Sequence, residues 1–176
     1  SYPAEWFTPV VDPHPPEWEI LPQSARPGEV ILSKRNELGI LSNFAPTSFE
    51  YRGKRYSSVE GFWQMMHYPE KKLEGKRDPR WKLGKKAWPH TRDEVSAMVS
   101  FEAKKAGELG ESNEAKLGID WVSFEGKKIR YRSAVPGEHD RLIREAMIEK
   151  LKQNPEVRRI LLSTGDLVLR PDHREE

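Results

Sequence analysis

Residues 41–68, LSNFAPTSFEYRGKRYSSVEGFWQMMHY, carry the strongest structural signal in this chain. After a polar turn, aromatic residues alternate on both sides of Arg52-Gly53, a pattern typical of a short β-hairpin whose glycine supplies a positive φ. A helix rich in aromatic residues is predicted to begin at the Ser57-Ser58 pair and to end by Tyr68, because a proline follows. This helix places one carboxylate, Glu60, among apolar neighbours.

Local pattern leaves two roles open for Glu60. Ser57-Ser58-Val59-Glu60 has the spacing of a capping box, in which the glutamate bonds the backbone at the helix start and needs no other role. Alternatively, Glu60, Gln64 and His67 share one helix face and could line a pocket. Spacing alone favours the cap for Glu60 and a packed or capping position for His67. The Ser42-Asn43-Phe44 segment indicates a turn in which Asn43 bonds its own backbone.

Residues 1–28 are dense in proline, which fixes φ and restricts the preceding residue, so we expect an extended arm. Trp6, Phe7, Trp18 and Ile20 indicate that this arm packs against the domain that follows. The alternative is a proline-rich segment that binds a partner. The domain itself is expected to cover residues 29–176.

Periodicity and turn residues predict the remaining elements of this domain. They are a strand at 30–32, mixed loop and helix at 71–86, a capped helix from Thr91 to the glycines at 107–110, a hairpin of strands 121–124 and 129–131, an amphipathic helix after Pro136-Gly137 broken at Asn154-Pro155, a last helix at 156–162 ended by Gly165, and a strand at 167–169. There is no βαβ alternation and no internal repeat. The pattern predicts a single, helix-rich α+β domain with short β-hairpins.

Basic residues gather between Lys71 and Lys86, interleaved with Trp81 and followed by Trp88. A solvated basic face is the simplest interpretation of such a run. Lysine and arginine also bind phosphates and tryptophan stacks on bases, so a surface for pyrophosphate or nucleic acid is the alternative. The net charge of the whole chain is only +2 and does not decide between them.

Composition excludes several kinds of chemistry. The chain has no cysteine, hence no disulfide, iron–sulfur cluster or thiol nucleophile. The five histidines lack metal-ligand spacing, and the nucleotide-binding, metalloprotease and serine-hydrolase motifs are missing, so we expect neither metal nor cofactor. No apolar run is long enough for a membrane span, and the first residues do not look like a signal peptide. We expect a soluble, cytoplasmic protein.

Residues 41–64, LSNFAPTSFEYRGKRYSSVEGFWQ, closely resemble the opening motif of the NADAR (YbiA-like) family, which pairs a Ser-Asn-Phe turn with a later helix that carries a serine, a glutamate and a glutamine, here Ser58, Glu60 and Gln64. Weaker similarity continues in Leu83-Gly84-Lys85, in Trp121 ahead of a long helix, and in residues 146–166, AMIEKLKQNPEVRRILLSTGD. The resemblance covers residues 31–169 and implies a YbiA-like fold.

The resemblance also implies an activity, because members of this family are N-glycosidases. Some hydrolyse ribosylamino-pyrimidine intermediates of riboflavin synthesis, and others remove ADP-ribose from the amino group of guanine, including as antitoxins to DNA ADP-ribosyltransferases. A carboxylate suits this chemistry, since cleavage of an N-glycosidic bond builds positive charge at the anomeric carbon. By correspondence of motifs, Glu60 matches the functional glutamate of the family and Trp121 a functional tryptophan.

We therefore expect an N-glycosidase that removes ADP-ribose from guanine in DNA or nucleotides, with Glu60, His67 and Trp121 as catalytic residues. The residues expected to contact substrate are Asn43, Phe44, Trp63, Gln64, Lys85 and Asp172. The expected partners are the ADP-ribosylated nucleotide or DNA and a cognate ADP-ribosyltransferase. The alternatives are the same chemistry on a riboflavin intermediate, a non-catalytic module that binds ADP-ribose or NAD, and a plain nucleic-acid-binding protein.

The sequence departs from the family pattern at three places. Many members carry lysine where His67 stands, and histidine can replace a lysine acid or base but not a lysine nucleophile. Gly61 stands where the family usually has histidine. The closing segment of the family, an aspartate followed by Trp-Gly and a glycine-rich turn, does not follow Arg170, although Asp172 matches its start. We expect the C-terminal end of the domain to be shortened or incomplete.

Overall fold

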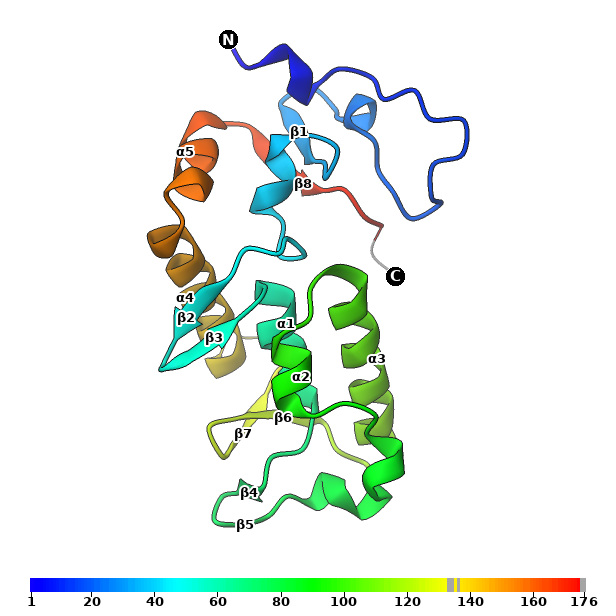
Figure 1. Cartoon of the computed structure of the whole chain (residues 1–176), viewed down its shortest axis with the longest axis vertical. Helices are drawn as coiled ribbons and strands as arrows, with labels where there is room; N and C mark the ends of the chain where they lie inside the picture. Colours follow the sequence, from blue (N-terminus) through cyan, green and yellow to red (C-terminus); the bar gives the residue numbers. More distant parts are fainter. Residues whose placement is uncertain (133–134, 136, 175–176) are drawn as a thin grey trace.

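The computed structural model describes residues 1–132, 135 and 137–174, and in this part of the chain five α-helices pack with four separate two-stranded sheets (Figure 1). The α-helices are α1 (Val59–Gln64), α2 (Arg92–Ser96), α3 (Ser100–Lys116), α4 (Glu138–Gln153) and α5 (Pro155–Ser163). The strands are β1 (Glu29–Leu32), β2 (Phe49–Tyr51), β3 (Lys54–Tyr56), β4 (Lys72–Leu73), β5 (Lys76–Arg77), β6 (Trp121–Phe124), β7 (Lys127–Arg130) and β8 (Val168–Pro171). Short 3-10 helices lie at η1 (Ala4–Trp6), η2 (Pro22–Ser24), η3 (Glu37–Leu41), η4 (Met65–His67), η5 (Pro79–Leu83) and η6 (Lys85–Ala87).

The predicted mixture of helices and short hairpins is confirmed. β2 pairs with β3 around Arg52-Gly53, and β6 pairs with β7, both antiparallel. The helix break at Asn154-Pro155 is also confirmed, and Gly165 follows α5 with a φ of +52°. Pro136, predicted to precede the amphipathic helix α4, lies outside the described residues. No helix in the described ranges is long and apolar enough to cross a membrane.

The larger hydrophobic core surrounds α1 and the hairpin β2–β3. Phe62 of α1 is its centre: the rings of Phe49, Tyr51, Tyr56 and Phe124 lie 4.9–6.3 Å from the Phe62 ring, between centroids. The three hairpin residues alternate along β2 and β3, so their side chains share the face that covers α1. Burial of such rings is a large part of the stabilisation of a small domain.

The prediction of one helix from Thr91 to the glycines at 107–110 is confirmed at its start and wrong in its continuity and its C-terminal end. The capping box at Thr91 is present, but it begins the short α2, and the chain turns at residues 97–99 before α3 starts. α3 then continues through Gly107 and Gly110 to Lys116. Glycine is required there by packing: a Cβ on Gly107 would lie 1.7 Å from Gln64 Oε1, and a Cβ on Gly110 would lie 2.7 Å from the His67 Cβ. The glycines allow α3 to approach α1 and η4 closely.

Residues 71–86, predicted as mixed loop and helix, also contain two short strands. β4 pairs with β5 in an antiparallel hairpin around Glu74-Gly75, where both residues have positive φ. The 3-10 helices η5 and η6 follow and supply the helical part of the prediction. Each of these strands has two residues, too few for hydrophobic alternation to reveal.

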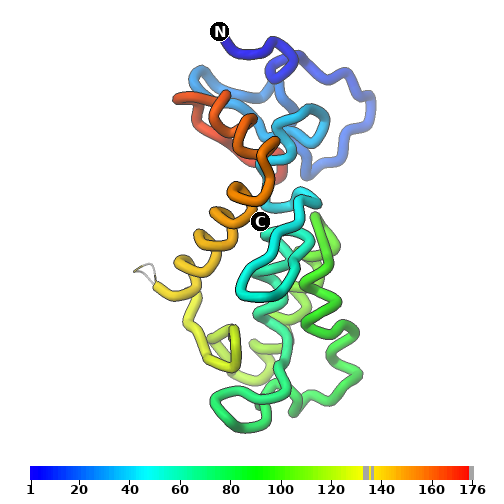
Figure 2. Tube along the Cα trace, turned by 60° about the vertical axis from the view of Figure 1, so that its left-hand side comes forward, coloured from blue at the N-terminus to red at the C-terminus, as the bar shows by residue number. Residues whose placement is uncertain are grey.

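A second hydrophobic cluster lies at the end of the molecule where β1 pairs with β8 in parallel. Trp6 from the proline-rich segment is fully buried there with Leu38 of η3 and Ile160 of α5, and its indole Nε1 donates to Glu37 Oε1 (2.8 Å). Phe7, by contrast, is 37% exposed. Figure 2 shows α4 and α5 running along one side of the molecule from the larger core to this end. α4 packs in the larger core, and α5 packs in the second cluster.

Candidate functional site

The Ser42–Phe44 turn lies between the two halves, and its own serine closes it. The Ser42 hydroxyl accepts a hydrogen bond from the Phe44 backbone amide (3.1 Å). The prediction that Asn43 bonds its own backbone is wrong: the Ala45 amide, which such a bond would use, donates to the Ser42 carbonyl (3.1 Å). The Asn43 side chain instead lines a cavity, described below.

Three helices hold the backbone of this turn. The Asn43 carbonyl accepts a hydrogen bond from the Glu60 amide of α1 (3.0 Å), and the Phe44 carbonyl accepts one from the Ser100 amide of α3 (3.0 Å). The Ser42 carbonyl accepts a hydrogen bond from the Lys150 ammonium of α4 (2.8 Å). Three successive carbonyls are thus fixed by three elements. The backbone bond between Glu60 and Asn43 holds the turn against the first turn of α1.

The predicted capping box at Glu60 is wrong. Ser58 is the capping residue of α1, and its hydroxyl accepts a hydrogen bond from the Gly61 amide (2.9 Å). The Ser57 amide, which the box would pair with Glu60, donates to a carbonyl of α2 instead. Because the helix begins one residue later than the box requires, the Glu60 carboxylate is released from the capping role.

The Glu60 side chain is buried, with the residue only 4% exposed. Its Oε2 accepts a hydrogen bond from Gln64 Nε2 (2.7 Å), one helical turn along α1. Burial raises the pKa of the Glu60 carboxyl, and the Gln64 bond and the positive charges of His173 and Lys104 oppose this rise. A carboxylate with poor solvation and a single protein hydrogen bond is well suited to accept a proton or to face a developing cation.

Glu60 opens into a cavity of about 390 Å³. Asn43, Lys150 and His173 supply the other polar groups of its wall, and Phe44 and Trp63 supply aromatic rings. Aliphatic side chains from α4, α5 and β8 form the rest. Such a mixture, mostly apolar with a few convergent polar groups, is typical of small-molecule sites.

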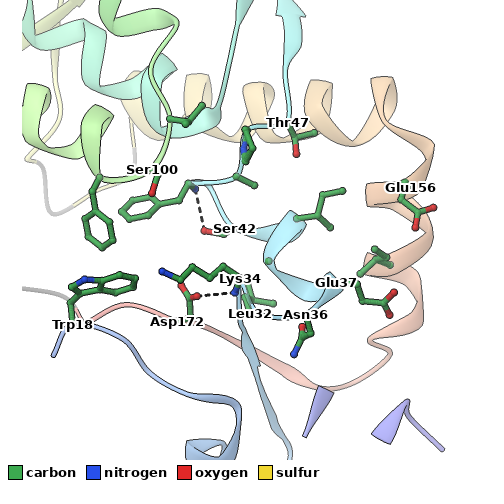
Figure 3. A pocket seen from close by; sticks show the side chains of 18 residues that line it. Trp18, Leu32, Lys34, Asn36, Glu37, Ser42, Thr47, Ser100, Glu156 and Asp172 are labelled. Carbon is green, nitrogen blue, oxygen red and sulfur yellow. Dashed lines mark hydrogen bonds between the residues drawn. The ribbon is translucent and has the colours of Figure 1, made fainter. Parts of the chain in front are cut away.

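A larger cleft of about 790 Å³ lies on the other side of the turn and shares Ser42 and Phe44 with the Glu60 cavity. Figure 3 shows Trp18, Lys34 and Asp172 along one side of this cleft and Thr47 and Ser100 along the other. Asp172 is buried, and its Oδ2 accepts a hydrogen bond from the Lys34 backbone amide (2.9 Å). The carboxylate therefore fixes the chain after β1 at the edge of the cleft.

His173 connects the two spaces. Its ring is stacked on Phe44 with 4.2 Å between centroids and 3° between planes. Phe44 in turn contacts Phe101, whose ring lies 4.5 Å from that of Trp18. This row of rings borders the cleft of Figure 3 and reaches the Glu60 cavity at His173. It offers flat apolar surfaces on which a planar group can stack.

The chain matches no family model, no curated protein and no solved structure. The role of this site therefore has to be argued from its chemistry. Of the predicted site residues, Asn43, Phe44, Glu60 and Trp63 lie together on the cavity wall, Gln64 contacts Glu60, and Asp172 lines the neighbouring cleft. Within the described residues, no three His, Asp or Glu side chains are grouped to hold a metal ion.

His67, predicted to be catalytic, lies outside both cavities. It is buried at the far end of η4, where its Nδ1 is 2.5 Å from Glu114 Oε1. Glu114 Oε2 accepts a hydrogen bond from Arg80 Nη1 (3.0 Å), and Arg80 also pairs with Asp78. His67 therefore belongs to a buried ionic network between η4, η5 and α3, where it has no access to Glu60.

Trp121 and Lys85 are also separate from Glu60. The Trp121 ring lies between two cations, with Arg80 Cζ and Lys128 Nζ each 5.0 Å from its centroid. Lys85 lines a shallow surface depression together with Lys71, Arg77 and Trp81. The structure thus divides the residues assigned by family resemblance between two regions, and only the residues of the first motif surround Glu60.

The basic stretch from Lys71 to Lys86 is only partly a surface. Arg80 is fully buried in the ionic network, and Trp88 is buried with its indole Nε1 donating to the Arg80 carbonyl (3.1 Å). Both residues hold η5 and η6 against the core, which is a structural role. The lysines at 71, 72, 82, 85 and 86 remain at the surface.

Two residues of the Glu60 cavity, Lys150 and His173, escaped the sequence analysis. The signal for Lys150 is its position: it follows Leu142 and Ala146 at intervals of four residues, so it lies on the buried face of α4, where lysine is unusual. His173 lies two residues beyond β8 and reaches Phe44 only through the pairing of β8 with β1. No local pattern indicates that contact.

Proposed function

We propose that this chain is a NADAR-like N-glycosidase with a YbiA-like fold, which hydrolyses an N-ribosyl bond and removes ADP-ribose from guanine in DNA or in nucleotides. The observation that carries the proposal is Glu60: a buried carboxylate with a raised pKa, freed from capping, in a cavity that the Ser-Asn-Phe turn also lines. Motif resemblance supports the substrate class, and the site chemistry supports the reaction type.

Glu60 would act at the anomeric carbon. The bond from C1′ to the guanine amino nitrogen breaks, and positive charge develops on the ribose ring, where a poorly solvated carboxylate stabilises it strongly. A water molecule then adds its oxygen to C1′ while Glu60 accepts one of its protons. Glu60 then gives this proton to the leaving amino nitrogen, so that free ADP-ribose and unmodified guanine result. The raised pKa of Glu60 makes its carboxylate a better base for this step.

The neighbours of Glu60 would hold the substrate. Trp63 and Phe44 present ring surfaces for the sugar or the base, and the Asn43 amide can bond ribose hydroxyls. Gln64 orients the carboxylate through its hydrogen bond. Since His67 and Trp121 lie away from Glu60, we assign them no catalytic role. A cognate ADP-ribosyltransferase that creates the modification would be the functional partner.

The test is mass spectrometry of guanine-ADP-ribosylated DNA incubated with the protein and with Glu60→Gln. Wild type should release ADP-ribose and restore guanine, and Glu60→Gln should lose at least about a hundredfold in rate while still binding ADP-ribose. The matched control is Glu102→Gln, an exposed glutamate of α3, which should react like wild type.

Other outcomes favour the alternatives. ADP-ribose binding with no release by wild type would replace the hydrolase with a binding module. Turnover of a ribosylamino-pyrimidine, with none of modified DNA, would keep the chemistry and change the substrate. DNA affinity that falls steeply with salt and ignores the modification would indicate a nucleic-acid-binding protein.

A further inference from the structure

In the part of the chain that the structure describes, Lys150 is a buried cation without an acidic partner. The residue is 4% exposed, and its Nζ donates a single hydrogen bond, to the Ser42 carbonyl (2.8 Å). An ammonium group has three N–H donors. Among the described residues, no carboxylate lies within 4.0 Å of this nitrogen. The described residues thus leave two of these donors and the charge without a partner.

Arg80 shows how the same fold treats a cation with a structural role. Arg80 is fully buried, but Asp78 and Glu114 both pair with its guanidinium, at 2.9 and 3.0 Å. An unpaired buried charge is costly, because burial removes its hydration and nothing replaces it. Lys150 differs from Arg80 in lining a cavity, so a ligand can supply the missing negative charge.

The charges around the cavity favour an anionic ligand. The titratable groups that line it with Lys150 are Glu60 from α1 and His173 from the segment after β8. Glu60 is held by Gln64 rather than by Lys150, and Lys104 of α3 adds a further positive charge near the carboxylate. Burial lowers the pKa of the Lys150 ammonium to about 8, as expected for a cation with no anion beside it.

We propose that Lys150 is a phosphate-binding residue, whose ammonium takes an anionic phosphate oxygen of a ribosyl phosphate bound in the Glu60 cavity. Lys150 and Glu60 contact consecutive peptide units, through the Ser42 and Asn43 carbonyls. A phosphate held at Lys150 would therefore set the position of the attached ribose relative to Glu60. The ribosyl part of this assignment rests on the proposed function, whereas the phosphate part rests on Lys150 alone.

The experiment is calorimetric titration with ribose 5-phosphate, ribose and inorganic phosphate between pH 7 and 9.5. Phosphate monoesters keep a constant charge in this range, since their second pKa is about 6. Wild type should bind ribose 5-phosphate about 10- to 100-fold more tightly than ribose at pH 7. That advantage should decline above pH 8, as Lys150 loses its proton.

Two variants isolate the amine. Lys150→Arg keeps its charge throughout and should bind ribose 5-phosphate with no decline above pH 8. Lys150→Met should bind ribose 5-phosphate no better than ribose at any pH. The matched control is Lys152→Met, an exposed lysine on the same helix, which should behave like wild type.

Several results would overturn the proposal. They are equal affinity for ribose and ribose 5-phosphate in wild type, undiminished phosphate preference in Lys150→Met, or a decline above pH 8 that persists in Lys150→Arg and so belongs to another group. Inorganic phosphate binding as tightly as ribose 5-phosphate would overturn the ribosyl assignment. These titrations need no turnover. A protein that prefers ribose 5-phosphate as described but releases no ADP-ribose would refute only the glycosidase activity. A protein that releases ADP-ribose but shows no such preference would refute only the phosphate site.

Discussion

Burial of Lys150 has a consequence for folding that can be measured without any ligand. Burial lowers the pKa of its amine to about 8 in the folded protein, from about 10.5 for an exposed lysine. Between these values the unfolded chain binds more protons than the folded one, so stability rises as pH increases through this window. Below pH 8 the folded state bears the full cost, about 3 kcal/mol for a shift of this size.

Lys150→Met should therefore stabilise the protein. We expect its free energy of unfolding at pH 7 to exceed that of wild type by about 2 kcal/mol, after the loss of about 1 kcal/mol for the Ser42 hydrogen bond. The difference should shrink towards pH 10. Urea unfolding at pH 7 and 9.5, followed by tryptophan fluorescence, measures it. A variant less stable than wild type at both pH values would show that the buried ammonium does not destabilise the folded protein.

His67 gives the opposite case, a buried ionisable residue with satisfied partners. His67→Ala removes one partner of the buried Glu114 and should cost about 3 kcal/mol of stability. Because His67 is remote from Glu60, turnover by the folded variant should remain close to wild type. His14→Ala, at an exposed histidine, serves as the control for denaturation. Loss of turnover in a fully folded His67→Ala protein would return His67 to the catalytic residues.

At the level of single residues, the sequence places Glu60 and Asn43 in one contiguous motif, and the structure places both on the wall of one cavity. The sequence also assigns His67 and Trp121 to the site of Glu60, because motif resemblance gives no information on the distances between residues. The sequence could have indicated Lys150, as a lysine on an apolar helix face, but only the structure shows that no acid of residues 1–132, 135 or 137–174 pairs with it.

Among the secondary-structure elements, the contact between α1 and α3 connects packing with the site. Gly107 lies against Gln64, and Gln64 holds the Glu60 carboxylate. The backbone of α3 thereby helps to position the Glu60 carboxylate through Gln64. No residue of α3 forms a hydrogen bond with Glu60 in the described structure.

Gly107→Ala tests this contact, because the direction of the change in stability shows whether the contact is tight. In an ordinary helix interior the change stabilises by about 1 kcal/mol. Here the new Cβ would lie 1.7 Å from Gln64 Oε1, so we expect a loss of about 1–3 kcal/mol instead. Displacement of Gln64 also removes a bond that lowers the pKa of Glu60, so the acid limb of the activity profile should move to higher pH.

Thermal unfolding and a pH–rate profile measure both effects. Ser112→Ala, at an exposed position of the same helix, is the control and should change stability by less than about 0.5 kcal/mol. A Gly107→Ala protein as stable as the control would mean that Gln64 moves aside freely.

The elements that the sequence predicts correctly are those set by neighbouring residues. The hairpins β2–β3 and β6–β7 depend on a glycine turn between alternating residues, and α4 depends on its own apolar stripe. The division between α2 and α3 depends on contacts with α1 and η4 instead. Glycines that normally end a helix here serve close packing, which a single sequence does not distinguish.

For the whole molecule, the main long-range feature is the end at which β1 pairs with β8, because segments distant in the sequence meet there. Residues 1–28, β1, η3, α5 and β8 come together there, and Trp6 is the largest side chain buried among them. The parallel pairing of β1 with β8 joins two short strands from opposite parts of the chain. Local patterns predict both strands but cannot predict that they pair.

Trp6→Ala should show how much this end depends on the proline-rich segment. We expect a loss of about 3–5 kcal/mol, because the substitution leaves a large cavity beside Leu38 and Ile160 and removes the hydrogen bond to Glu37. Val11→Ala lies in the same segment at a residue 96% exposed, and should be neutral. Chemical denaturation compares the two. Equal stability of both variants would mean that the domain holds together without the segment.

The pairing of β1 with β8 also sets the order of events while the protein is being made. β1 leaves the ribosome before β8 and has no partner until β8 has been translated. Until then Leu32 and Leu41 lack the wall that Leu169 and His173 complete. Closing so long an interval of chain is entropically slow compared with forming the hairpins and helices between its ends. A nascent chain can thus have a finished core around Phe62 and still be unable to bind anything at Glu60.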